Sequence, residues 1–236
     1  MPAWMTSGGA RICGFEVRGG VEAVTQGIDL WSKPYIIKRR DGSKMCLILM
    51  DTQGLWDKKT LNSFNFLSFF CNQGCHFFDD AIFNQKKNMN TEQLKQLANL
   101  AMMSKELVSD GRKRQFQHLD IMLRDYENYS LKKDTLETCE DKRRKRLNQL
   151  KTSFAERGPF EHVESCFQAV DLMCLIDPGE DVRDLEYDGL ISEIKPKFLQ
   201  LLSQHIQQVV NAIEPLKVNG EYLKGRDFEK WVRGKQ

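Results

Sequence analysis

Short apolar runs alternate with longer segments of helical periodicity along this chain. Residues 45–50, Met-Cys-Leu-Ile-Leu-Met, form a run of six apolar side chains. A run too short for a helix predicts a strand buried on both faces of a parallel sheet. Further strands are predicted over 116–123 and 167–176. Strands separated by helical segments indicate an α/β fold.

Apolar residues recur at helical spacing in the segments around these strands. The predicted helices cover 61–70, 91–108, 134–154, about 190–213 and 225–232. The first two present an apolar side to a core, whereas the helix over 134–154 is polar. Pro196 lies near the start of the fourth helix, where a proline costs least. The proline is therefore compatible with a helix there.

Two hairpins are predicted from turn residues between short extended segments. Residues 27–31 and 35–38 read as extended, and the turn Arg-Asp-Gly-Ser at 40–43 leads into the apolar run at 45–50. An Asn-Gly pair predicts a second hairpin over 217–222. The first hairpin is expected to feed the central strand of the sheet.

Length and charge limit the classes of protein. The chain has 236 residues and a formal net charge of +2, which gives no strong attraction to nucleic acid or acidic lipid. The longest apolar stretches reach about six residues, so we expect no membrane-spanning segment and no secretion leader, and a cytoplasmic protein. No internal repeat divides the chain. We expect an irregular segment over 1–11 and one domain over 12–236.

A basic run at 142–146 invites a nucleic-acid or nuclear-import interpretation. Acids at 134, 137, 140 and 141 offset much of its charge, which favours a solvated helix face. We therefore expect no nucleic-acid partner.

The seven cysteines are odd in number and irregularly spaced, which is typical of reduced thiols in a core. Cys71, Cys75 and His76 resemble half of a zinc site but lack a second ligand pair at finger-like spacing. A zinc site is not expected.

Candidate chemistry begins directly after the apolar run, in Asp51-Thr-Gln-Gly54. An acid at the carboxyl end of a parallel strand lies where open α/β sheets bind ligands. The Asp51 carboxylate is suited to Mg²⁺, and the backbone N–H of Gly54 can approach a terminal phosphate that a Cβ would crowd. A simple strand-ending turn explains the same four residues equally well.

Two more strands end in acidic or glycine-bearing turns, at Arg124-Asp125 and at Asp177-Pro178-Gly179. Right-handed crossovers place the carboxyl ends of parallel strands at one edge, so all three turns are expected to line up there. A carboxylate at Asp125 can accept two hydrogen bonds from guanine, which adenine cannot supply. The pattern predicts a purine-nucleotide site. A structural alternative for Arg124 is pairing with a local acid, Asp125 or Glu127.

Several segments together match one family in order and approximate spacing over residues 12–236. They are Phe-Glu-Val-Arg-Gly-Gly at 15–20, Thr-Gln-Gly-Ile-Asp-Leu-Trp at 25–31, Asp-Thr-Gln-Gly at 51–54, Arg-Asp at 124–125, Asp-Pro-Gly at 177–179, Tyr-Asp-Gly at 187–189, Val-Asn-Gly at 218–220 and Gly-Arg at 225–226. With these segments the chain resembles the G domain of atlastins and their guanylate-binding-protein relatives in the dynamin superfamily. Arginine-aspartate in place of the usual guanine motif Asn-Lys-x-Asp makes the resemblance specific.

The resemblance implies a P-loop GTPase-like fold, with a mostly parallel sheet and helices on both faces. It implies GTP hydrolysis with Mg²⁺, homodimerisation through G domains, and fusion of endoplasmic reticulum membranes from the cytosolic face. The implied roles are Thr25 and Asp51 for the metal, Thr25 and Gly54 for catalysis, Asp51, Gly54, Arg124, Asp125, Asp177, Pro178 and Gly179 for GTP, and Arg18 for the dimer face.

The chain departs from this family in one important respect, because it contains no Gly-x₄-Gly-Lys-Ser/Thr segment. We expect the domain to lack the P-loop and the strand before it, which we place between 45–50 and 116–123. Two hypotheses follow. Either this is a GTPase domain whose GTP affinity is far below that of an intact domain, or it is a non-catalytic interaction module that associates with full-length relatives.

Overall fold

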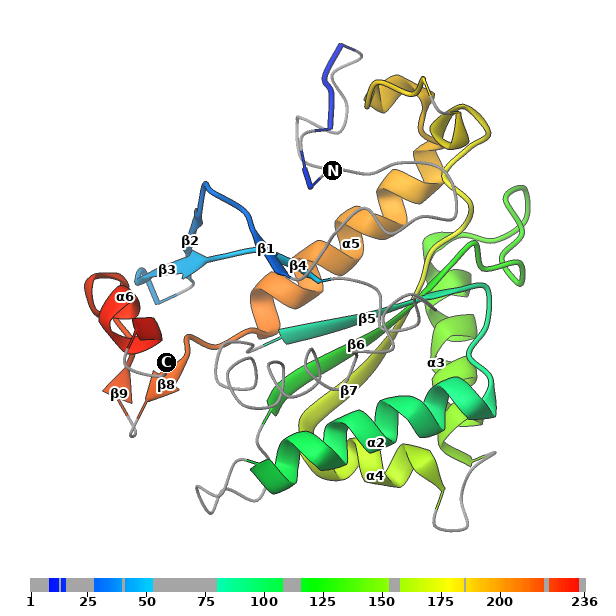
Figure 1. The fold of residues 1–236 in the computed structure, drawn as a ribbon. Helices are drawn as coiled ribbons and strands as arrows, with labels where there is room; N and C mark the ends of the chain where they lie inside the picture. The colour runs from blue at the N-terminus through cyan, green and yellow to red at the C-terminus, as the bar shows by residue number, and fades with distance from the viewer. Residues whose placement is uncertain are drawn as a thin grey trace.

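The centre of the fold is a three-stranded parallel sheet, seen in a computed structural model (Figure 1). The strands are β5 (Asp80–Lys86), β6 (Phe116–Arg124) and β7 (Phe167–Cys174), in the order β5-β6-β7. The structure describes residues 9–12, 14–15, 28–39, 41–52, 80–107, 116–152, 158–184, 186–218 and 221–233. The α/β class and the parallel sheet expected from the sequence are confirmed.

Helices cover both faces of this sheet. In Figure 1, α2 (Thr91–Leu107) and α4 (Pro159–Cys166) lie on one side and α5 (Pro196–Ala212) crosses the other. The polar helix α3 (Leu136–Thr152) packs along β7, where the Arg143 side chain donates a 2.8 Å hydrogen bond to the Leu172 carbonyl oxygen. The layers therefore match those expected of an α/β domain.

The core is built on β6, whose side chains are buried on both faces of the sheet. Leu119, Ile121 and Leu123 are almost completely enclosed, and so is Asp120 between them in sequence. Because side chains alternate across a strand, Asp120 lies on the opposite face from its leucine and isoleucine neighbours. Its imidazole partner His205 belongs to α5, so α5 covers the Asp120 face.

The apolar run at 45–50 does not form one strand of the parallel sheet, and that prediction is wrong. It is divided between β3 (Lys44–Leu47), antiparallel to β2 (Tyr35–Lys38), and β4 (Met50–Thr52), antiparallel to β1 (Ile28–Leu30). Met45 is buried, whereas Cys46 and Leu49 are exposed. Local pairing across the turn explains this result, because a tight turn brings antiparallel partners together with little loss of entropy.

The turn itself behaves as expected and confirms the first hairpin. The Asp41 carboxylate accepts a 2.9 Å hydrogen bond from the Ser43 backbone N–H, and Gly42 has a φ of 82°. A residue with positive φ favours glycine, because it carries no Cβ. The second hairpin, β8 (Lys217–Val218) with β9 (Glu221–Tyr222), is also confirmed.

The gap expected beside β6 is not found there. Among the described residues β6 has β5 on one side and β7 on the other, so no strand is missing between β6 and a neighbour. No element was predicted from the sequence for β5. Its residues alternate between half-buried and exposed positions, which gives a weak apolar signal.

The helices agree with expectation apart from one boundary and one omission. α2, α3 and α6 (Gly225–Arg233) match their predicted ranges within a few residues, while the predicted helix at 61–70 lies outside the described residues. α5 begins at Pro196 rather than near 190, because a proline restricts the preceding residue to an extended conformation. Short 3₁₀ turns, η3 (Asp181–Arg183) and η4 (Ile191–Glu193), precede it, and α4 was not anticipated. None of the helices in the described ranges is long and apolar enough to cross a bilayer.

Candidate functional site

Loops that follow the three parallel strands are joined by backbone hydrogen bonds at one edge of the sheet. The Lys87 N–H donates to the Arg124 carbonyl oxygen at 2.6 Å, which ties the end of β5 to the end of β6. The Leu175 N–H donates to the Leu123 carbonyl at 2.9 Å, and the Tyr126 N–H donates to the Leu175 carbonyl at 2.8 Å. The structure therefore brings the Arg124-Asp125 turn beside the chain that leads into Asp177.

Asp125 holds its carboxylate at this edge from an unusual backbone conformation. Its φ is 55°, in the left-handed region, which aspartate tolerates better than most residues. The side chain is largely enclosed and lies 3.7 Å from the Arg183 guanidinium and 3.9 Å from the Lys86 ammonium. The acid thus ends β6 at a fixed position among cations.

Asp177 organises the neighbouring loop with both of its carboxylate oxygens. One oxygen accepts hydrogen bonds of 2.9 Å from the Gly179 backbone N–H and from the Lys195 ammonium. The other forms an ion pair with Arg183. Arg183 therefore lies against both acids and connects the β6 turn to the β7 loop.

Gly179 is required at its position by geometry. Its φ is 143°, and a Cβ at this position would lie 3.2 Å from the Glu193 carbonyl oxygen. The Lys195 N–H donates a 2.8 Å hydrogen bond to the Pro178 carbonyl, so the loop is fastened to the residue that precedes α5. Asp177, Pro178 and Gly179 form a constrained cover beside Asp125.

The acids suggested as partners of Arg124 bind other cations. Asp125 approaches Lys86 and Arg183, and Glu127 forms a 2.6 Å ion pair with Lys87. The Lys87 hydrogen bond lowers the pKa of the Glu127 carboxyl. The local pairing considered as the structural alternative for Arg124 is therefore not the arrangement found in the described part of the chain, and its side chain is exposed.

Asp51 is placed differently from the other two acids. It lies on β4, opposite Asp29 of β1, in a two-stranded sheet separate from β5-β6-β7 within the described ranges. Two of the three expected turns thus meet at one sheet edge. Thr25, Gly54 and Arg18 lie outside the described residues.

Magnesium requires several oxygen ligands, which the described residues do not gather. The Asp51 carboxylate has suitable chemistry. However, no group of three or more His, Cys, Asp or Glu side chains in the described ranges is arranged to hold a metal. These residues alone do not fit a magnesium site, and we derive no chemical step through the ion.

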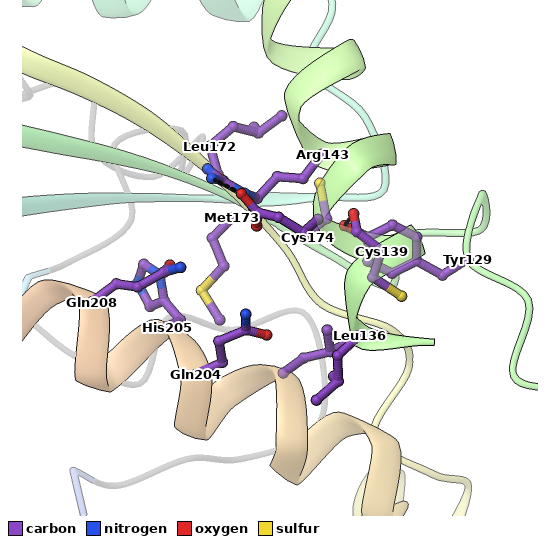
Figure 2. Close-up of a pocket in the computed structure, with 12 residues that line it drawn as sticks. Tyr129, Leu136, Cys139, Arg143, Leu172, Met173, Cys174, Gln204, His205 and Gln208 are labelled. Carbon is purple, nitrogen blue, oxygen red and sulfur yellow. Dashed lines mark hydrogen bonds and ion pairs between the residues drawn. The ribbon is translucent and has the colours of Figure 1, made fainter. Parts of the chain in front are cut away.

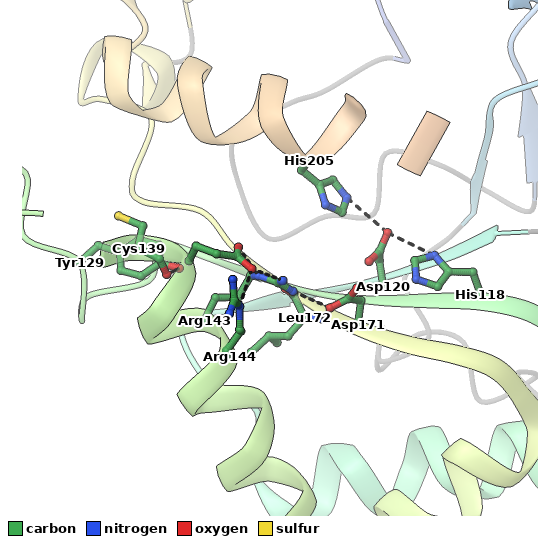
Figure 3. Close-up of polar contacts among 10 residues, drawn as sticks. His118, Asp120, Tyr129, Cys139, Arg143, Arg144, Asp171, Leu172 and His205 are labelled. Carbon is green, nitrogen blue, oxygen red and sulfur yellow. Dashed lines mark hydrogen bonds and ion pairs between the residues drawn. The ribbon is translucent and has the colours of Figure 1, made fainter. Parts of the chain in front are cut away.

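A second polar cluster, which sequence reasoning treated as ordinary histidines, lies under α5 (Figure 3). The carboxylate of Asp120, which is 2% exposed, lies 3.4 Å from His205 Nε2 and 3.8 Å from His118 Nδ1. Beside it, Arg143 of α3 binds Glu140, Asp171 and the Leu172 carbonyl oxygen. These contacts join α3 and α5 to the sheet.

A cavity between α3, β7 and α5 is too small to be the nucleotide site (Figure 2). Its volume is about 30 Å³, whereas ligand pockets are on the order of 300–1,000 Å³. Burial raises the pKa of the Cys174 thiol on its wall to about 12, and Tyr129 donates a 2.9 Å hydrogen bond to the Cys139 carbonyl oxygen. The thiol is held in its neutral form and the cavity is structural.

Comparison with known proteins gives a consistent result. The chain is 26% identical to Atlastin-2 of Xenopus laevis, 24% identical to Atlastin-1 of Bos taurus and 26% identical to Atlastin-3 of Mus musculus, in each case over 98% of its length. It spans 41%, 42% and 43% of those proteins, respectively. The family model for the guanylate-binding protein N-terminal domain matches residues 9–216. The match covers most of the chain, which therefore belongs to the family of guanylate-binding protein N-terminal domains.

Proposed function

We propose that this chain is a guanine-nucleotide-binding domain of the atlastin type, and that it reads the base with Asp125. The observation that carries the proposal is the position of this carboxylate. It is fixed at the carboxyl end of a central parallel strand, next to the Asp177–Gly179 loop. Ligands of open α/β sheets bind at this edge. Family membership and the site geometry therefore support the same assignment.

The chemistry of the base explains why an aspartate suits this task. Guanine presents an N1–H and a 2-amino group side by side, and the two oxygens of one carboxylate can accept both hydrogen bonds. Adenine has an acceptor at N1 and would leave the carboxylate without that pair of donors. Discrimination follows, because an unpaired buried acceptor costs about 1–3 kcal/mol.

The remaining roles extend the proposal by family resemblance. Thr25 and Asp51 are proposed for Mg²⁺, Thr25 and Gly54 for the hydrolytic step, and Arg18 for a homodimer face. Arg124 is proposed to line the base beside Asp125, and Pro178 and Gly179 to cover it. A place on the cytosolic face of the endoplasmic reticulum, and a part in membrane fusion, are proposed for the protein on the same ground.

Because the sequence has no Gly-x₄-Gly-Lys-Ser/Thr segment, we propose weak binding of phosphate. That loop normally supplies backbone N–H groups and a lysine to the phosphates. Titration of a fluorescent GDP or GTP analogue at millimolar Mg²⁺ measures the affinity. A micromolar or tighter dissociation constant would contradict the weak-binding part of the proposal.

Exchange of Asp125 for asparagine tests the base reader. Asp125→Asn replaces one acceptor with an amide donor, so preference should move from guanine toward xanthine, which carries a 2-oxo group in place of the 2-amino group. The readout is competition of GDP and XDP for the fluorescent analogue. Asp141→Asn, at an exposed position on α3, is the control and should keep the guanine preference. An unchanged preference in Asp125→Asn would reject Asp125 as the reader.

The lack of the glycine-rich segment also favours a second candidate function, a non-catalytic module that associates with full-length relatives. Light scattering after size exclusion, with and without a GTP analogue, separates the two. Dimerisation that depends on the analogue favours the GTPase. Constant association, with no response to nucleotide, favours the module.

A further inference from the structure

We propose that Arg183 occupies the base-reading position in the nucleotide-free protein and competes with guanine for Asp125. The proposal rests on the function proposed above. Its basis is a single contact pattern: the Arg183 guanidinium is ion-paired with Asp177 and lies 3.7 Å from the Asp125 carboxylate. One cationic group thus bridges the base reader and the loop that would cover the base.

The chemical match between the two competitors is close. The six-membered ring of guanine contains a guanidine unit, C2 with N1, N2 and N3, and its N1–H and 2-amino N–H point in the same direction. An arginine guanidinium presents a similar planar pair of N–H donors to a carboxylate. Both groups therefore satisfy the same acceptor, and only one can occupy its donor side at a time.

The local structure allows Arg183 to leave at low cost. It belongs to η3, a 3₁₀ turn of three residues, and its side chain is 57% exposed. When it departs, Asp177 keeps its hydrogen bonds from the Gly179 N–H and the Lys195 ammonium. The loop is therefore held together without Arg183, and the change is confined to the side of Asp125.

This competition predicts the opposite sign from simple electrostatics. A nucleotide is an anion, so loss of a nearby cation should weaken its binding if the cation acts only through charge. If Arg183 blocks the carboxylate, its loss should strengthen binding, because a larger fraction of the protein is competent to bind. An exposed ion pair of this type supports a change of about two- to fivefold.

The experiment compares the affinity for a ribose-labelled fluorescent GDP across four forms of the full chain. They are wild type, Arg183→Ala, Arg183→Lys and Lys86→Ala. Arg183→Ala should bind more tightly than wild type by about two- to fivefold. Arg183→Lys keeps the charge but loses the planar donor pair, so its affinity should fall between the two. Lys86→Ala removes a different cation near Asp125 and should bind no more tightly than wild type.

Salt provides a second readout on the same proteins. Screening weakens an exposed ion pair, so the advantage of Arg183→Ala over wild type should shrink between 0.05 and 0.5 M NaCl, both of these being chosen test conditions. Melting curves by circular dichroism establish that each variant is folded.

The outcomes separate this proposal from the function beneath it. Tighter binding by Arg183→Ala, including binding that appears only in this variant, supports competition. Equal or weaker binding by Arg183→Ala, with wild type still binding guanine nucleotide, overturns competition and leaves the proposed function intact. Absence of binding in every folded form overturns both.

Discussion

The Tyr126 backbone N–H donates to the Leu175 carbonyl oxygen at 2.8 Å, and this bond fixes the turn after β6 against the chain that leaves β7. Asp125 precedes the donor and Asp177 lies two residues beyond the acceptor. Both acids are therefore positioned by backbone bonding of the sheet and not only by their own side-chain contacts. Variants that change a side chain at this edge should leave the two turns together.

Gly179→Ala should destabilise the protein. The φ of 143° is unfavourable for alanine, and the added Cβ would meet the Glu193 carbonyl oxygen. We expect a loss of about 1–3 kcal/mol in the free energy of unfolding, measured by urea denaturation. Gly225→Ala is the matched control, because no atom lies within 4 Å of the position that its Cβ would take. A loss of equal size in both variants would show that Gly179 is not specially constrained.

Arg143→Ala should cost more stability than Arg144→Ala, although both side chains contact Glu140 on the same helix. Arg143 is largely enclosed and also binds Asp171 and the Leu172 carbonyl oxygen, so its removal leaves several acceptors unpaired. We expect a loss of about 2–3 kcal/mol for Arg143 and at most about 0.5 kcal/mol for Arg144. Thermal and urea denaturation of the two variants measure the difference. Similar losses would refute a structural role specific to Arg143.

Acid should weaken the attachment of the segment before α3, through Asp134. The Lys142 ammonium, followed by the Ser130 backbone N–H, lowers the pKa of the Asp134 carboxyl below its ordinary 3.8. A lowered native pKa gives stability that is fully present above the unfolded pKa and is lost as the pH falls through the native value. Unfolding of wild type and Asp134→Asn should therefore differ at pH 6 and converge below about pH 4.

The control for this pH dependence is Lys142→Met, which removes the main cause of the shift. In that background, Asp134→Asn should have a smaller effect at pH 6 than it has in the wild type. A difference that persists unchanged to pH 2 would contradict the assignment to Asp134.

Thiol labelling should distinguish one described cysteine from three others. Cys46 is exposed, whereas Cys139, Cys166 and Cys174 are buried. Alkylation with iodoacetamide at pH 8, read by mass spectrometry of peptides, should modify Cys46 first. Burial raises the pKa of Cys174 to about 12, so very little thiolate is present at this pH. Labelling in guanidinium chloride should remove the difference, and rapid native labelling of Cys174 would contradict its burial.

The strands and helices with strong patterns were predictable from sequence, whereas weakly patterned elements were not. β6 and β7 are continuous apolar segments with charged or Pro-Gly ends, so the positions of Asp125 and Asp177 followed from them. β5 ends in Asn-Gln-Lys and has an exposed Ile82, which hides its place in the sheet. The run at 45–50 misled, because apolar composition alone does not distinguish a hairpin strand from a parallel one.

The cations at the site were beyond sequence reasoning for a different reason. Arg183 and Lys195 reach Asp177 from 6 and 18 residues away, through two 3₁₀ turns whose directions no local pattern specifies. The same holds for His205, which meets Asp120 across the interface of a helix and a sheet. Such contacts depend on how the chain returns to the sheet, so they become visible only once the fold is known.

Lys195 has a mechanical consequence for the whole edge of the sheet. Its backbone N–H is bonded to Pro178, its ammonium to Asp177, and the next residue begins α5, whose far half carries His205 against the enclosed Asp120. A helix transmits displacement along its axis as a nearly rigid rod, at 1.5 Å per residue. The 177–179 loop consequently cannot swing outward without either breaking both Lys195 bonds or pulling the rod from its seat, and ligand entry must proceed by rotation of single side chains.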